Sequence, residues 1–388
     1  MNILYISNAC SVSEYDRLFK GMSVQINHQS QKFNRLFAEG IAKNGVNITM
    51  ISSRPVSYVF HKHKWYGKKT EDENGVHYLY LPFFNYKYVR QLFIYLTLKK
   101  EVKKWIRSNP GGIVLCDVLN YSLLSALSCF KQNIKIIGIV TDLPEILANG
   151  KITESVKRQN NMIAECDGLV LLARPMTEKI NHKNKPFVVM EGFCDVKMRD
   201  VENIFGEKYQ KKVVLYSGLL HEKYGIRNLT EAFIKADIAD SELHVYGRGD
   251  FEDQLKAIAE INDKVKYFGT KSNSYVVKEQ MKATLLVNPR PTNEEFVKYS
   301  FPSKNMEYLA SGTAMLTTEL PSMPDEYKEH CFVSRGYDQE SLKEALSEIL
   351  SMSKETLYRK GAEAKEWVLT KKDNITQTKK VIEFLETL

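Results

Sequence analysis

Short apolar runs alternate with longer amphipathic stretches along the whole chain. This alternation is typical of βα units, and near-continuous apolar strands suit a parallel sheet that is covered on both faces. In the first half, strands are expected at residues 2–7, 47–52, 112–117, 134–140, 168–173 and 186–190. Residues 31–45 keep their apolar side chains on one helical face and end at Gly45, so a helix is expected there.

The same pattern starts again in the second half. Strands are expected at 211–218, 242–249, 265–269, 284–290, 313–320 and 330–333, and helices at 227–236, 251–261, 274–282, 302–311 and 339–366. A chain of 388 residues is also too long for one ordinary core. We therefore expect an α/β protein with two Rossmann-like, doubly wound domains, 1–203 and 204–370, and a helix within 371–388 that can pack back on the first domain.

Composition narrows the class of protein further. The sequence contains no run of about 18 apolar residues, so a membrane-spanning helix is not expected. The opening MNILYISN lacks a basic region and a small-residue cleavage site, so we interpret it as a first strand rather than a signal peptide. The six cysteines are scattered without a C-x-x-C pair, which favours neither zinc nor disulfides and fits a reducing cytoplasm.

The net charge of +8 lies mostly in residues 54–107, which hold 12 basic and 4 acidic side chains. Aromatic residues such as Trp65 and Tyr88 are frequent in the same segment. Its stretch 86–107 sets apolar side chains among the basic ones: Val89, Leu92, Phe93, Leu96 and Leu98. The pattern predicts contact with an anionic membrane surface, at the inner face of the cell membrane. A packed helix with a basic outer face explains it equally well, and no motif supports nucleic-acid binding.

Glycine and basic residues recur where strands of the second half end. YSGLLHEKYG has Gly218 at the strand end and Lys223 before the next helix. VYGRGD places Gly247 and Arg248 at the next strand end, and NPRPTNEE places Arg290 at another. Glycine lets a ligand approach the backbone closely, and a basic side chain neutralises phosphate. Each feature alone is also explained as a loop glycine or a surface cation, but parallel strands end at one edge of a sheet, which predicts one shared site.

The stretch YSFPSKNMEYLASG adds a helix with an unusual start. Pro302 and Ser303 predict its beginning and Gly312 its end. Lys304 then lies in the first turn, at the positive end of the helix dipole, where acidic residues are normally preferred. Because helix N-termini bind anions, a bound phosphate would make that cation favourable. Glu307 follows one turn later on the same side.

The order of these motifs resembles the donor-binding half of the retaining GT-B glycosyltransferases of family 4, the group 1 glycosyltransferases of bacterial polysaccharide biosynthesis. The first half is similar to the N-terminal domain of that group, and MEGFCD (190–195) is similar to its interdomain N-G-V-D segment. The resemblance spans most of the chain and is most specific at residues 299–312. It implies two domains that face each other across a cleft, with a nucleotide diphosphate sugar between them.

The resemblance also implies roles for individual residues. The pyrophosphate would meet the N–H groups around Pro302 and Ser303, and Lys223 and Lys304 would neutralise the leaving diphosphate, so no metal or other cofactor is expected. Glu307 would bind the ribose hydroxyls. The glycines at the strand ends, and Gly21 in the loop after the first strand, would allow close approach to the phosphates.

Two positions depart from the family pattern. The arginine that usually follows the glycine of the first donor loop is Leu219 here, and Arg248 or Arg290 would replace it. The first glutamate of the E-x7-E pattern is Tyr299, for which the acidic pair at 294–295 would substitute. Donor binding is therefore better supported than the catalytic constellation.

The implied reaction is retaining transfer of a sugar, from a uridine diphosphate sugar as first expectation, to a lipid-linked or polysaccharide acceptor in capsule, exopolysaccharide or O-antigen assembly. Asp142 in VTDLPE would orient the acceptor or the sugar, although a structural strand-end aspartate is equally expected. Two alternatives stay open: a non-catalytic partner or scaffold subunit of a transferase, and a nucleotide-sugar epimerase or phosphorylase of the same fold. The histidines show no metal-ligand spacing.

Overall fold

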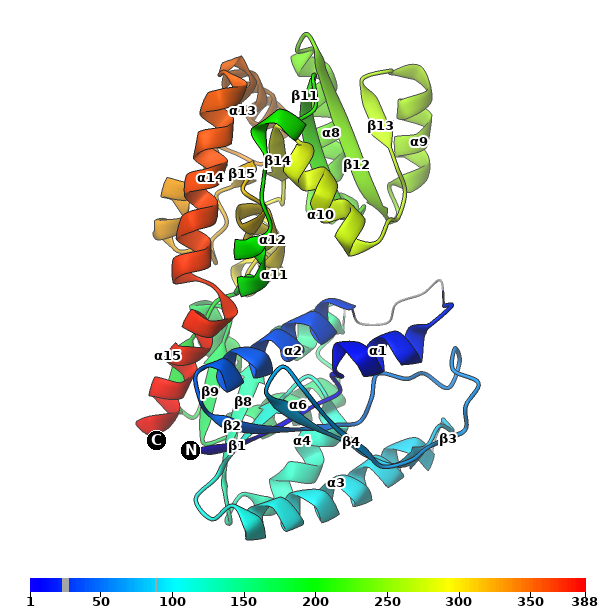
Figure 1. Ribbon diagram of the computed structural model, residues 1–388, viewed down its shortest axis with the longest axis vertical. Coiled ribbons are helices and arrows are strands. Elements are labelled where there is room, and N and C mark those ends of the chain that lie inside the picture. Colours follow the sequence, from blue (N-terminus) through cyan, green and yellow to red (C-terminus); the bar gives the residue numbers. More distant parts are fainter. Residues whose placement is uncertain (23–27, 88, 149) are drawn as a thin grey trace. The chain divides into compact units, whose positions relative to one another are not determined.

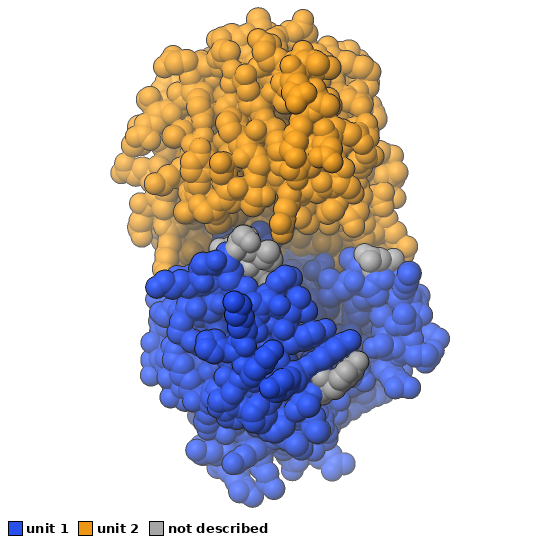
Figure 2. All heavy atoms as spheres, turned by 90° about the vertical axis from the view of Figure 1, so that its right-hand side faces the viewer, with its two compact units in different colours: residues 1–191, 374–388 blue, residues 192–373 orange. Residues whose placement is uncertain are grey.

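The computed structural model of the 388-residue chain describes residues 1–22, 28–87, 89–148 and 150–388. The chain forms two compact units (Figure 2), residues 1–191 with 374–388 and residues 192–373, called unit 1 and unit 2 below. The sequence-based boundaries were 203/204 and 370/371, whereas the chain enters unit 2 at Gly192 and returns to unit 1 at Asn374. Tyr88, an aromatic residue of the predicted membrane segment, lies outside the described residues.

Unit 1 is built on an eight-stranded sheet in the order β10-β9-β8-β7-β1-β2-β5-β4 (Figure 1). All neighbouring strands are parallel except β4 and β5, which are antiparallel. The strands are β1 Asn2–Ser7, β2 Asn47–Ser52, β4 Lys69–Glu73, β5 Val76–Tyr80, β7 Ile113–Asp117, β8 Lys135–Val140, β9 Gly168–Leu171 and β10 Phe187–Val189. A separate antiparallel pair consists of β3 (Trp65–Tyr66) and β6 (Phe83–Phe84).

Helices cover the sheet of unit 1. They are α1 Val12–Phe19, α2 His28–Lys43, α3 Val89–Ser108, α4 Tyr121–Leu127, α5 Pro144–Leu147, α6 Glu154–Ala164, α7 Thr177–Ile180 and α15 Asn374–Glu386. The strands are fully buried along most of their length, as near-continuous apolar sequences in a covered sheet should be. Strand β2 lies on one side of β1, and β7, β8, β9 and β10 follow one another on the other side. The direction in which strands are added therefore reverses between β1 and β7, which is the topological switch point.

Unit 2 repeats this design with a six-stranded, wholly parallel sheet in the order β13-β12-β11-β14-β15-β16. Its strands are β11 Lys212–Leu219, β12 Ser241–Arg248, β13 Val265–Tyr267, β14 Leu285–Asn288, β15 Ala314–Thr318 and β16 Phe332–Ser334. Its helices are α8 Ile226–Ala236, α9 Glu252–Ile261, α10 Asn273–Lys282, α11 Glu295–Lys298, α12 Ser303–Ser311, α13 Gln339–Ser351 and α14 Lys354–Lys371.

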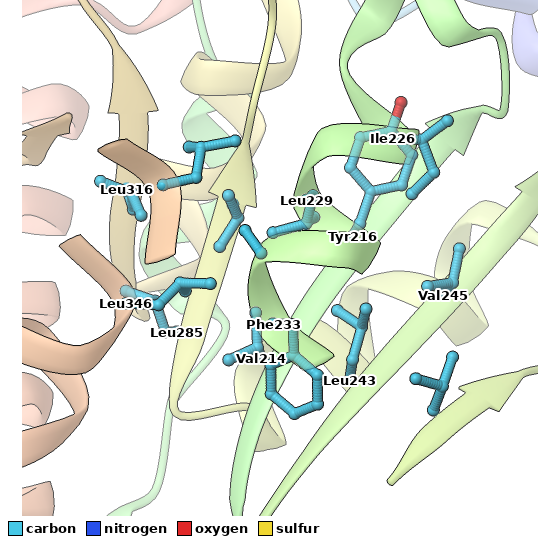
Figure 3. Packing of buried hydrophobic residues seen from close by; sticks show 14 of the residues in the cluster. Val214, Tyr216, Ile226, Leu229, Phe233, Leu243, Val245, Leu285, Leu316 and Leu346 are labelled. Atoms are coloured by element: carbon cyan, nitrogen blue, oxygen red, sulfur yellow. The ribbon is translucent and has the colours of Figure 1, made fainter. Parts of the chain in front are cut away.

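One face of this sheet packs against helices α8 and α13 to form the core of unit 2 (Figure 3). Val214, Leu243 and Leu285 of the strands meet Leu229 and Phe233 of α8, all almost completely buried. The apolar side chains of the strands fix their register by facing this core. Their carboxyl ends therefore reach one edge of the sheet, where the loops that follow them lie together.

The predicted α/β, doubly wound class is confirmed, with strand ends displaced by one or two residues from those expected. The sequence interpretation was incomplete in the first half. It missed α1 and the strands β3, β4, β5 and β6 between residues 65 and 84. Strand β5 belongs to the main parallel sheet, but its alternating sequence VHYLY lacks the continuous apolar run that identified the other strands.

Candidate functional site

The switch point of unit 2 lies between β11 and β14. Strands β12 and β13 follow β11 on one side, and β15 and β16 follow β14 on the other. Gly218, the penultimate residue of β11, has a φ of 146° and is paired with Gly247 of β12, whose φ is 133°. A Cβ added at Gly247 would lie 1.8 Å from the carbonyl oxygen of Gly218, so no other residue fits. Both strand ends therefore present bare backbone at the point where this fold class binds ligands.

Lys304 of α12 projects to the same point. Its ammonium group lies 3.9 Å from the centre of the Tyr216 ring, and a Cβ added at Gly218 would lie 2.5 Å from Nζ. Burial, with a smaller contribution from the positive charge of Arg290, lowers the pKa of Lys304 to about 7, while Glu307 acts in the opposite direction. A cation that is desolvated beside a second cation favours an anionic ligand, because the anion would stabilise the charged form of both.

The first turn of α12, which carries Lys304, also contributes backbone N–H groups to this point. The helix begins at Ser303, and its N-cap residue is Pro302, which has no side-chain oxygen to cap the turn. The helix ends as predicted at Gly312, whose φ is 77°. Its N-terminal N–H groups and the Lys304 side chain together form a positively polarised corner beside Gly218.

The loop after β14 supplies a second cation. The guanidinium of Arg290 lies 5.4 Å from the centre of the Tyr224 ring and 5.3 Å from that of Phe296. Tyr224 belongs to the loop after β11, and this loop touches the other one directly: a Cβ added at Gly225 would lie 1.9 Å from the Pro289 carbonyl oxygen. The two loops at the switch point are thus packed together with Arg290 between aromatic rings.

The remaining predicted cations are more exposed. Lys223 lies in the short turn Glu222–Tyr224 and is exposed, with Nζ 5.4 Å from the neighbouring Tyr224 ring centre. Arg248 is the exposed last residue of β12 and pairs with Leu219, which is itself exposed. The structure therefore brings Arg290 into the electrostatic environment of Lys304, whereas Arg248 lies at the outer end of the strand pair.

The carboxylate of Glu307 is held by two amides of α10. Gln280 Nε2 donates to Glu307 Oε1 at 2.9 Å, and Asn273 Nδ2 donates to Glu307 Oε2 at 3.4 Å. Sequence reasoning missed both amides. Their only signal is a seven-residue spacing, which places them on one face of a helix two turns apart, a weak indication without knowledge of the partner.

Tyr299, which occupies the position of the expected first glutamate, is buried in unit 2. The acidic residues suggested as substitutes, Glu294 and Glu295, are exposed at the start of α11. The phenol of Tyr299 is thus buried where the family pattern has a carboxylate, and the substitution by Glu294 or Glu295 stays a prediction.

Unit 1 carries two carboxylates where adjacent strands end. Asp142 follows β8 and is half-buried just before α5. Asp117, missed from the sequence, is the buried last residue of β7 and accepts from Asn34 Nδ2 at 3.3 Å and from the Leu119 N–H at 3.2 Å. Burial raises the pKa of Asp117 to about 6. Gly21 lies exposed after α1 with a φ of 75°.

Two negative observations concern the described part of the chain. No group of three or more His, Cys, Asp or Glu residues within it is arranged to hold a metal ion. None of its described helices is both long enough and apolar enough to cross a membrane.

Solved structures share this architecture over the full length of the chain. Sucrose-phosphate synthase from Thermosynechococcus elongatus is 14% identical, with a TM-score of 0.67 over 100% of this chain and 99% of that one. A structure described as trehalose-6-phosphate from E. coli bound with UDP-2-fluoro glucose is 11% identical, with a TM-score of 0.69 over 100% and 99%. The lipopolysaccharide outer core galactosyltransferase WaaB, in its apo form, is 15% identical, with a TM-score of 0.63 over 100% and 99%.

The shared fold is GT-B, and together with the family match of unit 2 it supports a glycosyltransferase that uses a nucleotide-sugar donor. Residues 198–367, most of unit 2, match the family model described as "Glycosyl transferases group 1". No curated protein sequence shows significant similarity to the chain. The resemblance expected from the sequence motifs is thereby confirmed at the level of family and fold.

Proposed function

We propose that the protein transfers a sugar, with retention of configuration and without a metal, from a uridine diphosphate sugar to a lipid-linked or polysaccharide acceptor. The observation that carries the donor half of this proposal is the contact of Lys304 with Gly218 at the switch point of unit 2. A uridine nucleotide is the first candidate because UDP-2-fluoro glucose is bound in one of the similar structures.

In this proposal the diphosphate binds to the backbone of Gly218 and Gly247 and to the N–H groups at Ser303. Lys304 and Arg290 neutralise the charge that develops on the leaving diphosphate, the task of a metal ion in other transferases. Arg290 suits this role better than Arg248, because its charge acts on Lys304. Lys223 and Arg248 would contribute from the exposed side.

The sugar half of the nucleotide is assigned to Glu307. A carboxylate accepts hydrogen bonds from two vicinal hydroxyls, and acidic residues bind ribose in this way in other dinucleotide sites. Glu307 lies one helical turn beyond Lys304 on the same side of α12. Diphosphate and ribose would therefore bind to successive turns of one helix.

The acceptor half is assigned to unit 1, with Asp142 orienting the acceptor hydroxyl or the transferred sugar and Gly21 in the loop near the phosphates. The leaving phosphate would accept the hydroxyl proton, so no enzyme nucleophile is required. Assembly of a bacterial capsule, exopolysaccharide or O-antigen is the setting we propose, since a lipopolysaccharide galactosyltransferase is among the similar structures.

A lipid-linked acceptor would place the protein at the inner face of a membrane. The supporting observation is that large apolar side chains are exposed together with lysines within residues 54–107. The outward side of α3 carries, in order, Val89, Leu92, Leu96, Lys100, Lys103 and Arg107. Leu98 was expected on this surface but is fully buried in unit 1, because it lies on the opposite side of the helix.

The test is a thermal-shift panel of nucleotide diphosphates and their sugars, followed by hydrolysis of the best binder without acceptor. A rise in melting temperature with one nucleotide, and slow release of free sugar that persists in EDTA, are expected. A chain that binds no nucleotide would contradict the donor assignment. A chain that binds but never cleaves would favour a non-catalytic partner role, and a change of the sugar without cleavage would favour an epimerase.

A further inference from the structure

A buried amide of α10 joins two parts of the candidate donor site. Gln280 is completely buried, and its Nε2 donates both to Ser217 Oγ at 3.1 Å and to Glu307 Oε1 at 2.9 Å. Ser217 directly precedes Gly218 at the end of β11, and Glu307 belongs to α12. One side chain thus connects the strand end that faces the diphosphate with the carboxylate assigned to the ribose.

The groups around Gln280 are fixed on both sides. Its main-chain carbonyl accepts from Thr313 Oγ1 at 2.8 Å, which holds the helix at this point. Ser217 is held by the buried Tyr308, whose hydroxyl oxygen accepts from the Ser217 N–H at 2.9 Å. Because both neighbours are anchored, the amide has little freedom to rotate, and its donor is directed at Glu307 before any ligand arrives.

Glu307 receives the second α10 amide, Asn273, on its other oxygen at 3.4 Å. A carboxylate has about four acceptor positions, more than two amides occupy, so such donors orient the group while it still accepts hydroxyl protons. Two side chains of α10 therefore help to orient the carboxylate of Glu307.

We propose that Gln280 is a positioning residue for donor recognition: it holds Glu307 in the orientation that accepts the ribose hydroxyls, in register with the diphosphate at Gly218. The inference rests on the proposed nucleotide-sugar function. It predicts that loss of the amide weakens recognition of the ribose specifically and leaves recognition of the diphosphate intact.

The experiment compares a ribonucleoside diphosphate with its 2′-deoxy counterpart by calorimetry on the full chain. The probe is the nucleotide that binds best among UDP, ADP and GDP. Wild-type protein should prefer the ribonucleotide, and Gln280→Leu should weaken that nucleotide about tenfold while barely changing the deoxynucleotide, because a hydrogen bond to a charged group is lost. The preference for ribose should therefore nearly disappear.

Gln280→Glu keeps the shape of the side chain and gives a readout that loss of packing cannot produce. It places a second carboxylate at hydrogen-bond distance from Glu307, and two such groups cannot both ionise without repulsion. One shared proton restores the bond at low pH and is lost at high pH. Ribonucleotide affinity of this variant should consequently fall as pH rises, with a steeper slope than in the wild type.

Gln377→Leu is the matched control, since Gln377 is equally buried but lies on α15 in unit 1, where it bonds to the Met190 carbonyl. It should lower the melting temperature and leave the ribose preference unchanged. Full ribose preference in both Gln280 variants, together with its loss in Glu307→Gln, would overturn the positioning role and leave the proposed function standing. A wild-type protein that binds the nucleotide without ribose preference would overturn the positioning role and the ribose assignment of Glu307, whereas one that binds no nucleotide would overturn the proposed function as well.

Discussion

At the scale of single residues, Lys304 should make donor binding depend on pH. Burial lowers its pKa to about 7, so without an anion beside it the ammonium is mostly charged below pH 7 and mostly neutral above. A bound diphosphate favours the charged form, so binding above pH 7 requires uptake of a proton. The affinity for a nucleotide diphosphate sugar should be constant below pH 7 and fall by up to about tenfold per pH unit above it, as measured by calorimetry.

Lys304→Met should remove this slope and weaken binding by about tenfold or more at pH 6.5, since the variant lacks the charge at every pH. Lys365→Met provides the comparison, because burial also lowers the pKa of Lys365. This lysine belongs to α14 and its ammonium group donates to the Val201 carbonyl. That variant should keep the wild-type slope. An unchanged slope in Lys304→Met would show that another group titrates.

The residues of the candidate site fall into two groups: those that their neighbours in the sequence identify, and those whose partners are distant in the sequence. Gly218, Lys304 and Glu307 could be predicted because a strand end or a helix start defines their surroundings within a few positions of the chain. Gln280 and Asn273 could not, since their importance arises only when α10 packs beside α12. Asp117 was missed for the same reason: its partner Asn34 is remote in sequence and meets it only in the folded sheet.

At the scale of elements, the paired ends of β11 and β12 should tolerate no side chain. Gly247→Ala would bring a Cβ to 1.8 Å from the Gly218 carbonyl oxygen, in a backbone conformation that L-residues rarely adopt. We expect the free energy of unfolding to fall by about 2 kcal/mol or more, from denaturant titration. Gly206→Ala, exposed with open space around it, should change it little.

Nucleotide affinity separates the two explanations of any loss in Gly247→Ala. If the glycine only relieves crowding, the variant keeps the wild-type affinity. Added nucleotide should then raise its free energy of unfolding by the same amount as in the wild type. If the bare backbone contacts the diphosphate, the affinity itself should fall. A variant as stable as the wild type would contradict the close approach of the strands.

Parallel strands of this protein were predictable because they are apolar throughout, and this holds for β1, β7 and β8. The segment between residues 65 and 84 was not, because its short strands alternate or consist of two residues. Their pairing depends on contacts across the chain, such as the Asn85 side chain that donates to the His63 carbonyl at 3.3 Å. Such strands have no local signal that separates them from loops.

At the scale of the whole molecule, the chain completes unit 1 with its last helix. Asn374 Nδ2 of α15 donates to the Leu36 carbonyl of α2 at 2.9 Å, and Asn44 Nδ2 donates to the Ile375 carbonyl at 2.9 Å. The two helices touch at Gly40, where an added Cβ would lie 2.2 Å from the Asn374 carbonyl oxygen. Gly40→Ala should therefore detach α15, seen as faster proteolysis near residues 371–374 than in Gly206→Ala. Equal proteolysis of the two variants would contradict this packing.

Membrane contact is also a property of the whole molecule, since its surface must supply both apolar area and charge. Trp65, Leu92 and Leu96 are 51%, 57% and 55% exposed, and residues 54–107, to which they belong, are rich in lysine. Replacing all three by Ser should lower binding to vesicles of phosphatidylcholine and phosphatidylglycerol by at least about tenfold in sedimentation, because exposed apolar side chains enter the lipid interface. Salt should weaken the wild-type binding only in part, since it screens the lysines alone.

The control for this surface is a triple variant that removes three exposed apolar side chains elsewhere. Leu147, Ile152 and Ile261 are 59%, 66% and 89% exposed but lie outside residues 54–107. Their replacement by Ser should leave vesicle binding unchanged if the surface around α3 is the membrane contact. Equal losses in both triple variants would indicate unspecific adsorption, and no vesicle binding by the wild type would favour a saccharide acceptor that is reached without a bilayer.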